Sequence, residues 1–334
     1  MQQQLSINRR QFGATLLVCL AILAAGNLVV ARLTAHTVSR RVLEDARNAT
    51  SAQVVALGNS LVRAGFVRDV FLPAHAPFTK FPAVNLALGA SSPVEQLLIL
   101  REAFRAKSNP RLLIYGFYDF QLTDPLSFSN ADIIGNHDIL YYQEPEFARS
   151  FFQMTRYDSA AFEMTRRFPM LAERGAVWAK VELFRRFITQ QGMPPELRTR
   201  FGRAADFTLL EAKSKDEFEQ HCLQAAQGGL NAAISEIIRE AQQHSTRSVF
   251  IVMPLPPKHI ETFYETVAWS AYQRHIRQLL AAQGVAYLDA SRWIPDASKF
   301  GDALHLSDQG AEEFSRRLAA ACSDLERAKF CEDN

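Results

Sequence analysis

Short apolar runs alternate with longer segments of helical spacing in two stretches of the chain, and this alternation constrains the fold most. The runs cover residues 53–57, 83–88 and 112–115 in the first stretch, and 248–253 and 285–289 in the second. Most of them end at Gly or Pro, which is typical of short strands buried on both faces. Strands that alternate with helices predict an α/β fold, with a parallel sheet covered by helices on both faces.

The segments between these runs carry the helix signals that such a fold needs. Residues 61–71 have helical spacing, and Ser92 begins a second helix, with Pro93 at the first position and Glu95 placed for a capping box. Further helices are expected over 230–244, 262–283 and 308–328.

Ligands of parallel α/β sheets bind outside the carboxyl ends of the strands, so the residues that follow each strand are the informative ones. In chain order, the chemistry-bearing residues at these positions are Ser60, Gly89, Tyr118, Asp119, Asp302 and His305. The last two follow the final strand after a short loop and lie at the start of a helix. Because these positions share one edge of the sheet, we expect their side chains to converge.

This set contains the groups that nucleophilic catalysis by serine requires. A serine nucleophile needs a base that accepts its proton and a third group that orients the base. His305 is the candidate base and Asp302 the candidate orienter. The N–H groups of Ser60 and Gly89 could form an oxyanion hole, in which each donor contributes about 3 kcal/mol. Taken singly, Ser60 fits a turn and the Asp-x-x-His pair fits a helix start; their order and joint placement favour a catalytic triad.

Four short blocks resemble the SGNH (GDSL-like) hydrolase superfamily. Residues 58–61 (Gly-Asn-Ser-Leu) resemble its first block, 85–89 (Asn-Leu-Ala-Leu-Gly) its glycine block, and Asp302-x-x-His305 its last block; 116–119 (Gly-Phe-Tyr-Asp) stand where its Gly-x-Asn-Asp block would fall. The resemblance covers 53–125 and 228–325. It implies a flavodoxin-like parallel sheet of the SGNH hydrolase type and a serine nucleophile.

Two positions depart from the pattern of that superfamily. Asn59 replaces the usual aspartate before the serine, and Tyr118 stands where the oxyanion asparagine is expected. The third donor of the oxyanion hole is therefore missing or supplied by another residue. Asn59, Tyr118 and Asp119 are interpreted as support for the site.

An apolar run of 20 residues, Phe12–Ala31, lies near the start of the sequence, with Thr15 and Asn27 as its polar members. As a helix it would be about 30 Å long, the thickness of the hydrocarbon core of a bilayer. The alternative is a cleaved signal peptide, with 24–26 as the cleavage site. We expect an uncleaved anchor because apolar residues continue through 28–30, although basic residues on both sides leave the orientation open.

The predicted organisation has an anchor, a linker and one large domain. The parts are a short basic N-terminus over 1–11, a transmembrane anchor over 12–32, a linker over 33–52 and an SGNH-like domain over 53–334 with a helical insertion at 126–227. Helices in the insertion are expected over 145–155, 159–168 and 176–190. From Arg149 to Arg203 there are eleven basic and five acidic residues, which fits either a solvated helical cap or a lid that borders an acceptor groove or meets anionic lipid and a membrane partner.

Composition excludes several classes of function. With 37 basic and 35 acidic residues there is no basic stripe for nucleic acid. The other histidines lack the spacing of metal ligands, so we expect neither a metal nor a cofactor. Four cysteines are too few for a disulfide scaffold. Cys322 and Cys331 could pair only if the chain turned back, because a helix through both would separate them by about 13 Å.

The anchor, the fold and the helical insertion together resemble the membrane-anchored SGNH proteins of cell-envelope acylation, such as the D protein of teichoic acid D-alanylation and the alginate O-acetylation proteins. That resemblance implies a single-pass protein of a bacterial-type inner membrane with its catalytic domain on the periplasmic side. A membrane-bound O-acyltransferase would supply an acyl group, often acetyl, and the serine would pass it to a polysaccharide acceptor. Two alternatives stay open: an extracytoplasmic carbohydrate esterase or deacetylase, and a non-catalytic SGNH-like scaffold or polysaccharide-binding protein.

Overall fold

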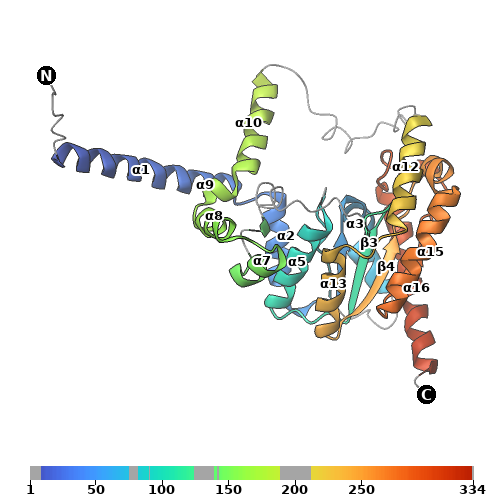
Figure 1. The fold of residues 1–334 in the computed structure, drawn as a ribbon. Coiled ribbons are helices and arrows are strands. Elements are labelled where there is room, and N and C mark those ends of the chain that lie inside the picture. The colour runs from blue at the N-terminus through green and yellow to red at the C-terminus, as the bar shows by residue number, and fades with distance from the viewer. Residues whose placement is uncertain are drawn as a thin grey trace. The chain divides into compact units, whose positions relative to one another are not determined.

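The computed structural model describes residues 9–74, 82–89, 91–123, 139–140, 143–188 and 212–332 (Figure 1). They belong to two compact units: one joins Met1–Arg40 to Asn130–Met193, and the other joins Arg41–Ser129 to Pro194–Asn334. The second unit holds the sheet. Parts of the predicted insertion, 126–138, 141–142 and 189–211, lie outside the described residues, as do 124 and 125 before it.

The sheet of the second unit has five parallel strands in the order β2-β1-β3-β4-β5. The strands are β1 (Val54–Gly58), β2 (Ala83–Asn85), β3 (Leu112–Phe117), β4 (Arg247–Val252) and β5 (Ala286–Asp289). This is the flavodoxin-like order of a doubly wound sheet. The predicted fold class is confirmed, and each of the five apolar runs overlaps one strand.

The central strands are apolar because helices cover both of their faces. Every residue of β1 and β3 is buried. On one side, α5 (Pro93–Arg105) packs against β1 and against α13 (Ala232–Gln243), which also contacts β4. Separately, α16 (Asp308–Glu332) packs against two short helices, α3 (Ser60–Gly65) and α4 (Arg68–Ala74). The start of α5 is as predicted, since the Ser92 N–H donates to Glu95 Oε2 at 2.8 Å.

The helix expected over 61–71 is divided into α3 and α4. The break occurs at Phe66, whose backbone is extended. Ser315 of α16 stabilises the break, because its Oγ accepts from the Val67 N–H at 2.9 Å and donates to the Gly65 carbonyl at 3.1 Å. A partner 250 residues away along the chain therefore ends α3, and no local sequence signal marks it.

Three other segments differ from expectation. The helix expected over 262–283 begins later, as α15 (Val267–Ala282), and a π-helical turn at Ile260–Tyr264 precedes it. The segment predicted as a linker contains a helix, α2 (Val38–Asn48). Helix α12 (Ala212–Ala225) was not predicted; it packs against α15 in the second unit.

The first unit combines the N-terminal helix with helices of the insertion. They are α1 (Arg9–Thr34), α7 (Pro145–Phe151), α8 (Arg156–Arg167), α9 (Pro169–Ala172) and α10 (Arg174–Ile188). Helix α1 contacts α9 and α10, and the Met170 N–H donates to Asn27 Oδ1 at 3.0 Å. The buried carboxylate of Glu173 pairs with Arg40 at 2.8 Å. Asn27, a polar residue of the apolar run, therefore has a hydrogen-bond partner in the insertion.

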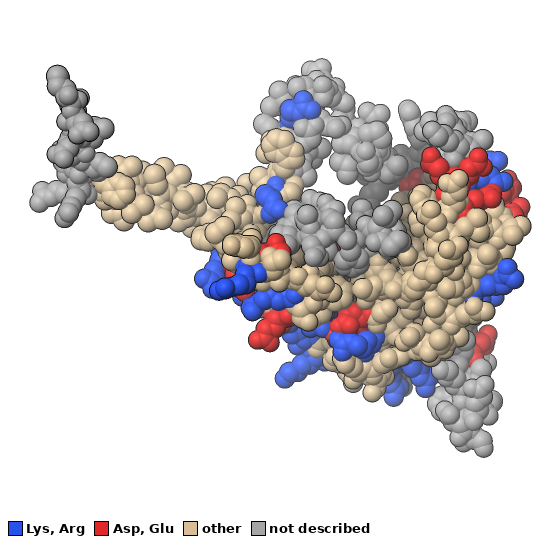
Figure 2. All heavy atoms as spheres, in the orientation of Figure 1, with Lys and Arg blue, Asp and Glu red and all other residues tan. Residues whose placement is uncertain are grey.

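Among the described residues, α1 is the helix long and apolar enough to cross a membrane, over Gln11–Thr34. Its side chains are largely exposed, including Leu17, Ile22 and Leu28. Figure 2 shows most of its described length free of charged side chains. A helix with this exposed apolar surface is suited to a lipid environment.

Candidate active site

Ser60 lies at the carboxyl end of β1, where it is the first residue of α3. Asn59 caps this helix: its Oδ1 accepts from the Leu61 N–H at 2.8 Å, and its side chain is buried. Asn59 therefore acts as the N-cap of α3, a role that aspartate also fills. Because Ser60 is the first residue of the helix, its N–H has no intrahelical acceptor.

Two glycines let α3 begin close to the strand ends. Gly58 ends β1 with φ of 150°, and it pairs with Gly116 of β3. A Cβ at Gly58 would lie 2.5 Å from the Gly116 carbonyl oxygen, and a Cβ at Gly116 would lie 2.2 Å from Val62 Cγ2. Side chains at either position would push α3, and with it Ser60, away from the sheet.

The imidazole of His305 lies between Ser60 and Asp302. Its Nε2 is 2.9 Å from Ser60 Oγ, and its Nδ1 is 2.9 Å from each carboxylate oxygen of Asp302. A carboxylate only accepts hydrogen bonds, so Nδ1 carries a proton when the ring is neutral. Nε2 is then free to accept the Ser60 hydroxyl proton. The three side chains form one continuous chain of hydrogen bonds, in which a proton can pass between Ser60 and His305.

Backbone groups hold the Asp302 carboxylate in place. Its Oδ1 accepts from the N–H groups of Leu304 and His305, both at 2.8 Å. Burial raises the pKa of Asp302, but the hydrogen bonds from the His305 side chain and from these two N–H groups outweigh burial and bring the pKa below its usual value. Asp302 is therefore ionised at neutral pH and can stabilise a protonated His305.

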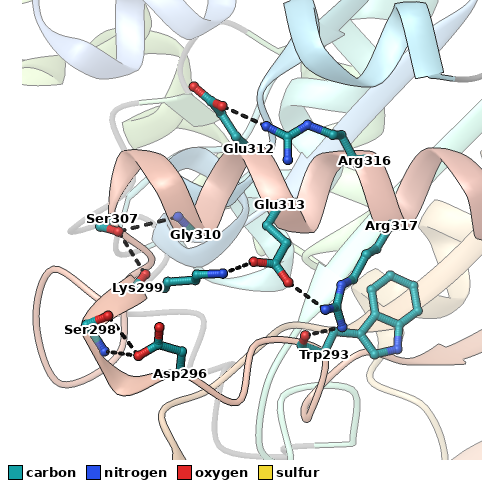
Figure 3. Close-up of polar contacts among 10 residues, drawn as sticks. All are labelled: Trp293, Asp296, Ser298, Lys299, Ser307, Gly310, Glu312, Glu313, Arg316 and Arg317. Atoms are coloured by element: carbon teal, nitrogen blue, oxygen red, sulfur yellow. Dashed lines mark hydrogen bonds and ion pairs between the residues drawn. The ribbon is translucent and has the colours of Figure 1, made fainter.

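The loop that carries Asp302 and His305 is tied to α16 (Figure 3). The Lys299 carbonyl accepts from the Ser307 N–H at 2.9 Å and from Ser307 Oγ at 3.0 Å, which closes the loop at its base. The Lys299 ammonium pairs with Glu313, and Glu313 also pairs with Arg317 at 2.5 Å. A Cβ at Gly310 would lie 2.2 Å from the Lys299 carbonyl oxygen, so a side chain there would displace the base of the loop.

Gly89, which follows β2, lies beside Ser60. A Cβ built on Gly89 has Ser60 Cβ as its nearest neighbour, at 3.8 Å. The glycine thus leaves open the space next to the serine. The structure therefore brings Gly89 next to Ser60.

Asp119 belongs to a hydrogen-bonded cluster that sequence analysis did not find. Its N–H donates to Tyr264 Oη at 2.9 Å, and its Oδ1 accepts from that hydroxyl at 3.0 Å. His259 Nε2 lies 3.2 Å from the same carboxylate oxygen. Burial, followed by the Asp119 charge, raises the pKa of Tyr264, which keeps the phenol protonated as a donor. This cluster anchors the loop after β3, and nothing in the spacing of 119, 259 and 264 indicated it.

Tyr118 contributes its backbone N–H to the site, and it lacks the side-chain amide of the asparagine expected at this position. Its N–H donates to Gln121 Oε1 at 3.4 Å, and the same oxygen accepts from Asn59 Nδ2 at 3.0 Å. Burial, followed by the neighbouring charge of Asp119, raises the pKa of the Tyr118 phenol. Gln121, which sequence analysis did not single out, thus connects the loop after β3 to the residue before Ser60.

Within the described part of the chain, no group of three or more His, Cys, Asp or Glu side chains could hold a metal ion. Helix α16 runs through both Cys322 and Cys331. A helical path between them separates the two backbones by about 13 Å, beyond the reach of a disulfide. The Cys331 side chain lies outside the described residues.

Comparisons with known proteins concern the fold. The lipase/acylhydrolase from Enterococcus faecalis matches with 11% identity and a TM-score of 0.38, over 82% of this chain and 96% of that one. A GDSL-like lipase from Bacteroides thetaiotaomicron matches with 10% identity and a TM-score of 0.34, over 81% and 88%. No protein-family model and no curated protein sequence matches the chain. These solved structures are of the class that the sequence blocks resemble.

Proposed function

We propose that this chain is a membrane-anchored SGNH-type serine acyl-transfer enzyme that forms an acyl intermediate on Ser60. The observation that carries the proposal is the position of His305, 2.9 Å from both Ser60 Oγ and the Asp302 carboxylate. Enzymes of several unrelated folds catalyse acyl transfer with a nucleophile, a base and an orienting group that contact one another in this order. The order of the blocks along the chain also supports the SGNH class.

The proposed reaction has two halves. In the first, His305 Nε2 takes the Ser60 hydroxyl proton as Oγ attacks the carbonyl carbon of an acyl donor. The tetrahedral intermediate collapses, the bond to the leaving group breaks, and His305 returns the proton to that group. In the second, an acceptor hydroxyl gives its proton to His305 and attacks the acyl-serine, and Ser60 leaves with the proton.

Asp302 and the oxyanion donors lower the barriers of both halves. The ionised Asp302 orients His305 and stabilises its protonated form. The N–H groups of Ser60 and Gly89 are the proposed donors to the oxyanion, and each donor in such a hole contributes about 3 kcal/mol. Asn59 and the Asp119 cluster position the two loops that meet at Ser60.

We further propose that α1 anchors the chain in a bacterial-type inner membrane, with the catalytic unit on the periplasmic side. The exposed apolar length of α1 supports the anchor. The acceptor would be a hydroxyl of an envelope or secreted polysaccharide, and a membrane-bound O-acyltransferase would deliver the acyl group, as in the anchored proteins that the sequence resembles. Acetyl is the acyl group proposed first.

Hydrolysis is the second candidate, because nothing in the Ser60–His305–Asp302 contacts requires a sugar acceptor. With water in the second half, the same residues make an extracytoplasmic carbohydrate esterase or deacetylase. The third possibility, a non-catalytic scaffold, is less compatible with the geometry, because an imidazole held between a serine hydroxyl and an ionised carboxylate is the arrangement that activates a serine nucleophile.

Labelling by a fluorophosphonate separates the catalytic candidates from the scaffold. We expect the full chain in detergent to be labelled on Ser60 and the Ser60→Ala variant to remain unlabelled while still folded. Acceptor competition separates the first two candidates: an acetylated Ser60 that persists in water and is discharged by polysaccharide indicates transfer. Rapid discharge in water alone would indicate hydrolysis instead.

A further inference from the structure

The loop after β3 contains a carboxamide whose orientation is determined by its neighbours. Gln121 follows Tyr118 by three residues, and it accepts two hydrogen bonds on one side-chain atom. One comes from the Tyr118 N–H, which can only donate. That bond alone requires the accepting atom of Gln121 to be the oxygen.

The second bond gives the same assignment independently. Asn59 Oδ1 accepts from the Leu61 N–H at 2.8 Å, so the other heteroatom of Asn59 is its NH2 group. This NH2 group donates to Gln121 at 3.0 Å. The Gln121 oxygen is therefore committed to two donors, and the Gln121 NH2 group is turned away from both.

The Gln121 NH2 group has no hydrogen-bond acceptor in the described part of the chain. It is half-buried and shares its carbon with an oxygen that lies 3.0 Å from Asn59, the residue before Ser60. An amide donor without an acceptor, in the loop that contacts the residue before Ser60, is available to bind charge that appears only during reaction.

The turn after β3 explains how Gln121 reaches this place. Asp119 has a φ of 49°, a left-handed conformation that Asp tolerates better than most residues. Tyr264 holds it there through both the N–H and the carboxylate of Asp119. The turn reverses the chain, and the Gln121 side chain comes back to Tyr118 and Asn59.

We propose that Gln121 Nε2 is the third donor of the oxyanion hole, together with the N–H groups of Ser60 and Gly89. It supplies the side-chain amide that Tyr118, with its phenol, lacks. This inference rests on the proposed acyl transfer at Ser60 and adds a catalytic residue to it.

Two variants separate a donor from a structural bridge. Gln121→Glu keeps an oxygen for the Tyr118 N–H and for Asn59 but has no NH2 group. Gln121→Met is neutral and removes both oxygen and NH2. The full chain is compared in detergent by the rate constant for fluorophosphonate labelling of Ser60, with thermal unfolding as the check on folding.

We expect both variants to be labelled about 100- to 1,000-fold more slowly than the wild type. The melting temperature should change little in Gln121→Glu and fall in Gln121→Met, which loses the two bridging hydrogen bonds. Labelling of Gln121→Glu at the wild-type rate would overturn the proposal, because the hydrogen bonds to the side-chain oxygen at 121 would then be enough for reactivity of Ser60. A loss only in Gln121→Glu would overturn it as well, since the added charge would explain the effect. If the wild type itself is not labelled, the proposed acyl chemistry fails rather than this inference.

A second readout excludes a loss that comes from disturbed loops. Turnover of p-nitrophenyl acetate is compared with turnover of its thionoester, in which sulfur, a weaker hydrogen-bond acceptor, replaces the carbonyl oxygen. A lost donor lowers the preference for oxygen in both variants. An unchanged preference would identify Gln121 as a positioning residue and contradict its role as a donor.

Discussion

His305 Nε2 and Ser60 Oγ lie 2.9 Å apart, although 245 residues separate them along the chain. The contact exists because β1 and the loop before α16 meet at the carboxyl edge of one parallel sheet. Asp302 contacts the opposite nitrogen of the same imidazole, Nδ1. The contact between His305 and Ser60 allows the reactivity of Ser60 to be tested directly.

Removing the charge of Asp302 is expected to slow acylation. In Asp302→Asn, the His305 ring loses the carboxylate that fixes its protonation and stabilises its cation, so labelling of Ser60 should fall about 10³- to 10⁴-fold. The measurement is the fluorophosphonate labelling rate. Asp296→Asn is a matched control, because Asp296 caps an exposed turn of the same loop; a similar loss there would contradict the specific role of Asp302.

The lowered pKa of Asp302 predicts how its contribution to stability depends on pH. A carboxyl group whose pKa is lower in the folded state stabilises the fold above its unfolded pKa of about 3.9. That contribution is lost as the pH falls through the folded pKa. The free energy of unfolding of the wild type, minus that of Asp302→Asn, should therefore shrink from pH 5 downward. A difference that grows as the pH falls would contradict stabilisation of the ionised Asp302 carboxylate by its hydrogen bonds.

Gly301 in the loop and Gly310 in the first turn of α16 are expected to differ in their tolerance of a methyl group. Gly310→Ala places a Cβ 2.2 Å from the Lys299 carbonyl oxygen, whereas the nearest atom to a Cβ at Gly301 is 3.9 Å away. Gly310→Ala should cost about 1–3 kcal/mol of stability and slow labelling of Ser60. Gly301→Ala should change neither. Thermal unfolding and labelling rates of the two variants test this difference. Equal stability and equal labelling rates would contradict the predicted clash at Gly310.

Trp178 tests the proposed membrane placement of the first unit. Its side chain is 70% exposed on α10, a helix that contacts α1, while Trp269 is buried in the second unit. Lys180 of the same helix donates to the Leu33 carbonyl, near the end of the apolar segment of α1. We expect brominated lipids to quench Trp178 in reconstituted vesicles, because aromatic residues near the ends of a span favour the interface.

Trp178→Phe is the control for this measurement, since it should remove most of the quenchable signal without releasing the chain from vesicles. Wild-type protein that floats with vesicles but shows no quenching of Trp178 would contradict an interfacial position for α10.

Sequence patterns predicted the sheet and the position of Ser60 because both depend on local signals. Strands buried on both faces are continuous apolar runs, and the carboxyl-edge rule assigns the residues after them to one region. The break between α3 and α4 was missed because Ser315 stabilises it from a distant helix. The role of Gln121 was missed for a related reason: a glutamine in a loop becomes informative only when the turn at Asp119 brings it to Asn59.

The pairing of His259 and Tyr264 with Asp119 was equally hidden. The π-helical turn at Ile260–Tyr264 carries Tyr264 to the loop after β3, and such turns have no sequence signature that a pattern of apolar residues can reveal. Sequence reasoning therefore singled out Ser60, Asp302 and His305, which the structure brings into contact, but not the groups that hold the neighbouring loop.

The most direct test is peptide mass spectrometry of the full chain after brief incubation with p-nitrophenyl acetate and quenching in acid. We predict that one acetyl group is found on the peptide containing Ser60, and that it is absent from Ser60→Ala and strongly reduced in His305→Ala. Folded wild-type protein that carries no acetyl group on Ser60, or carries it equally in the His305→Ala variant, would contradict acyl transfer through this serine.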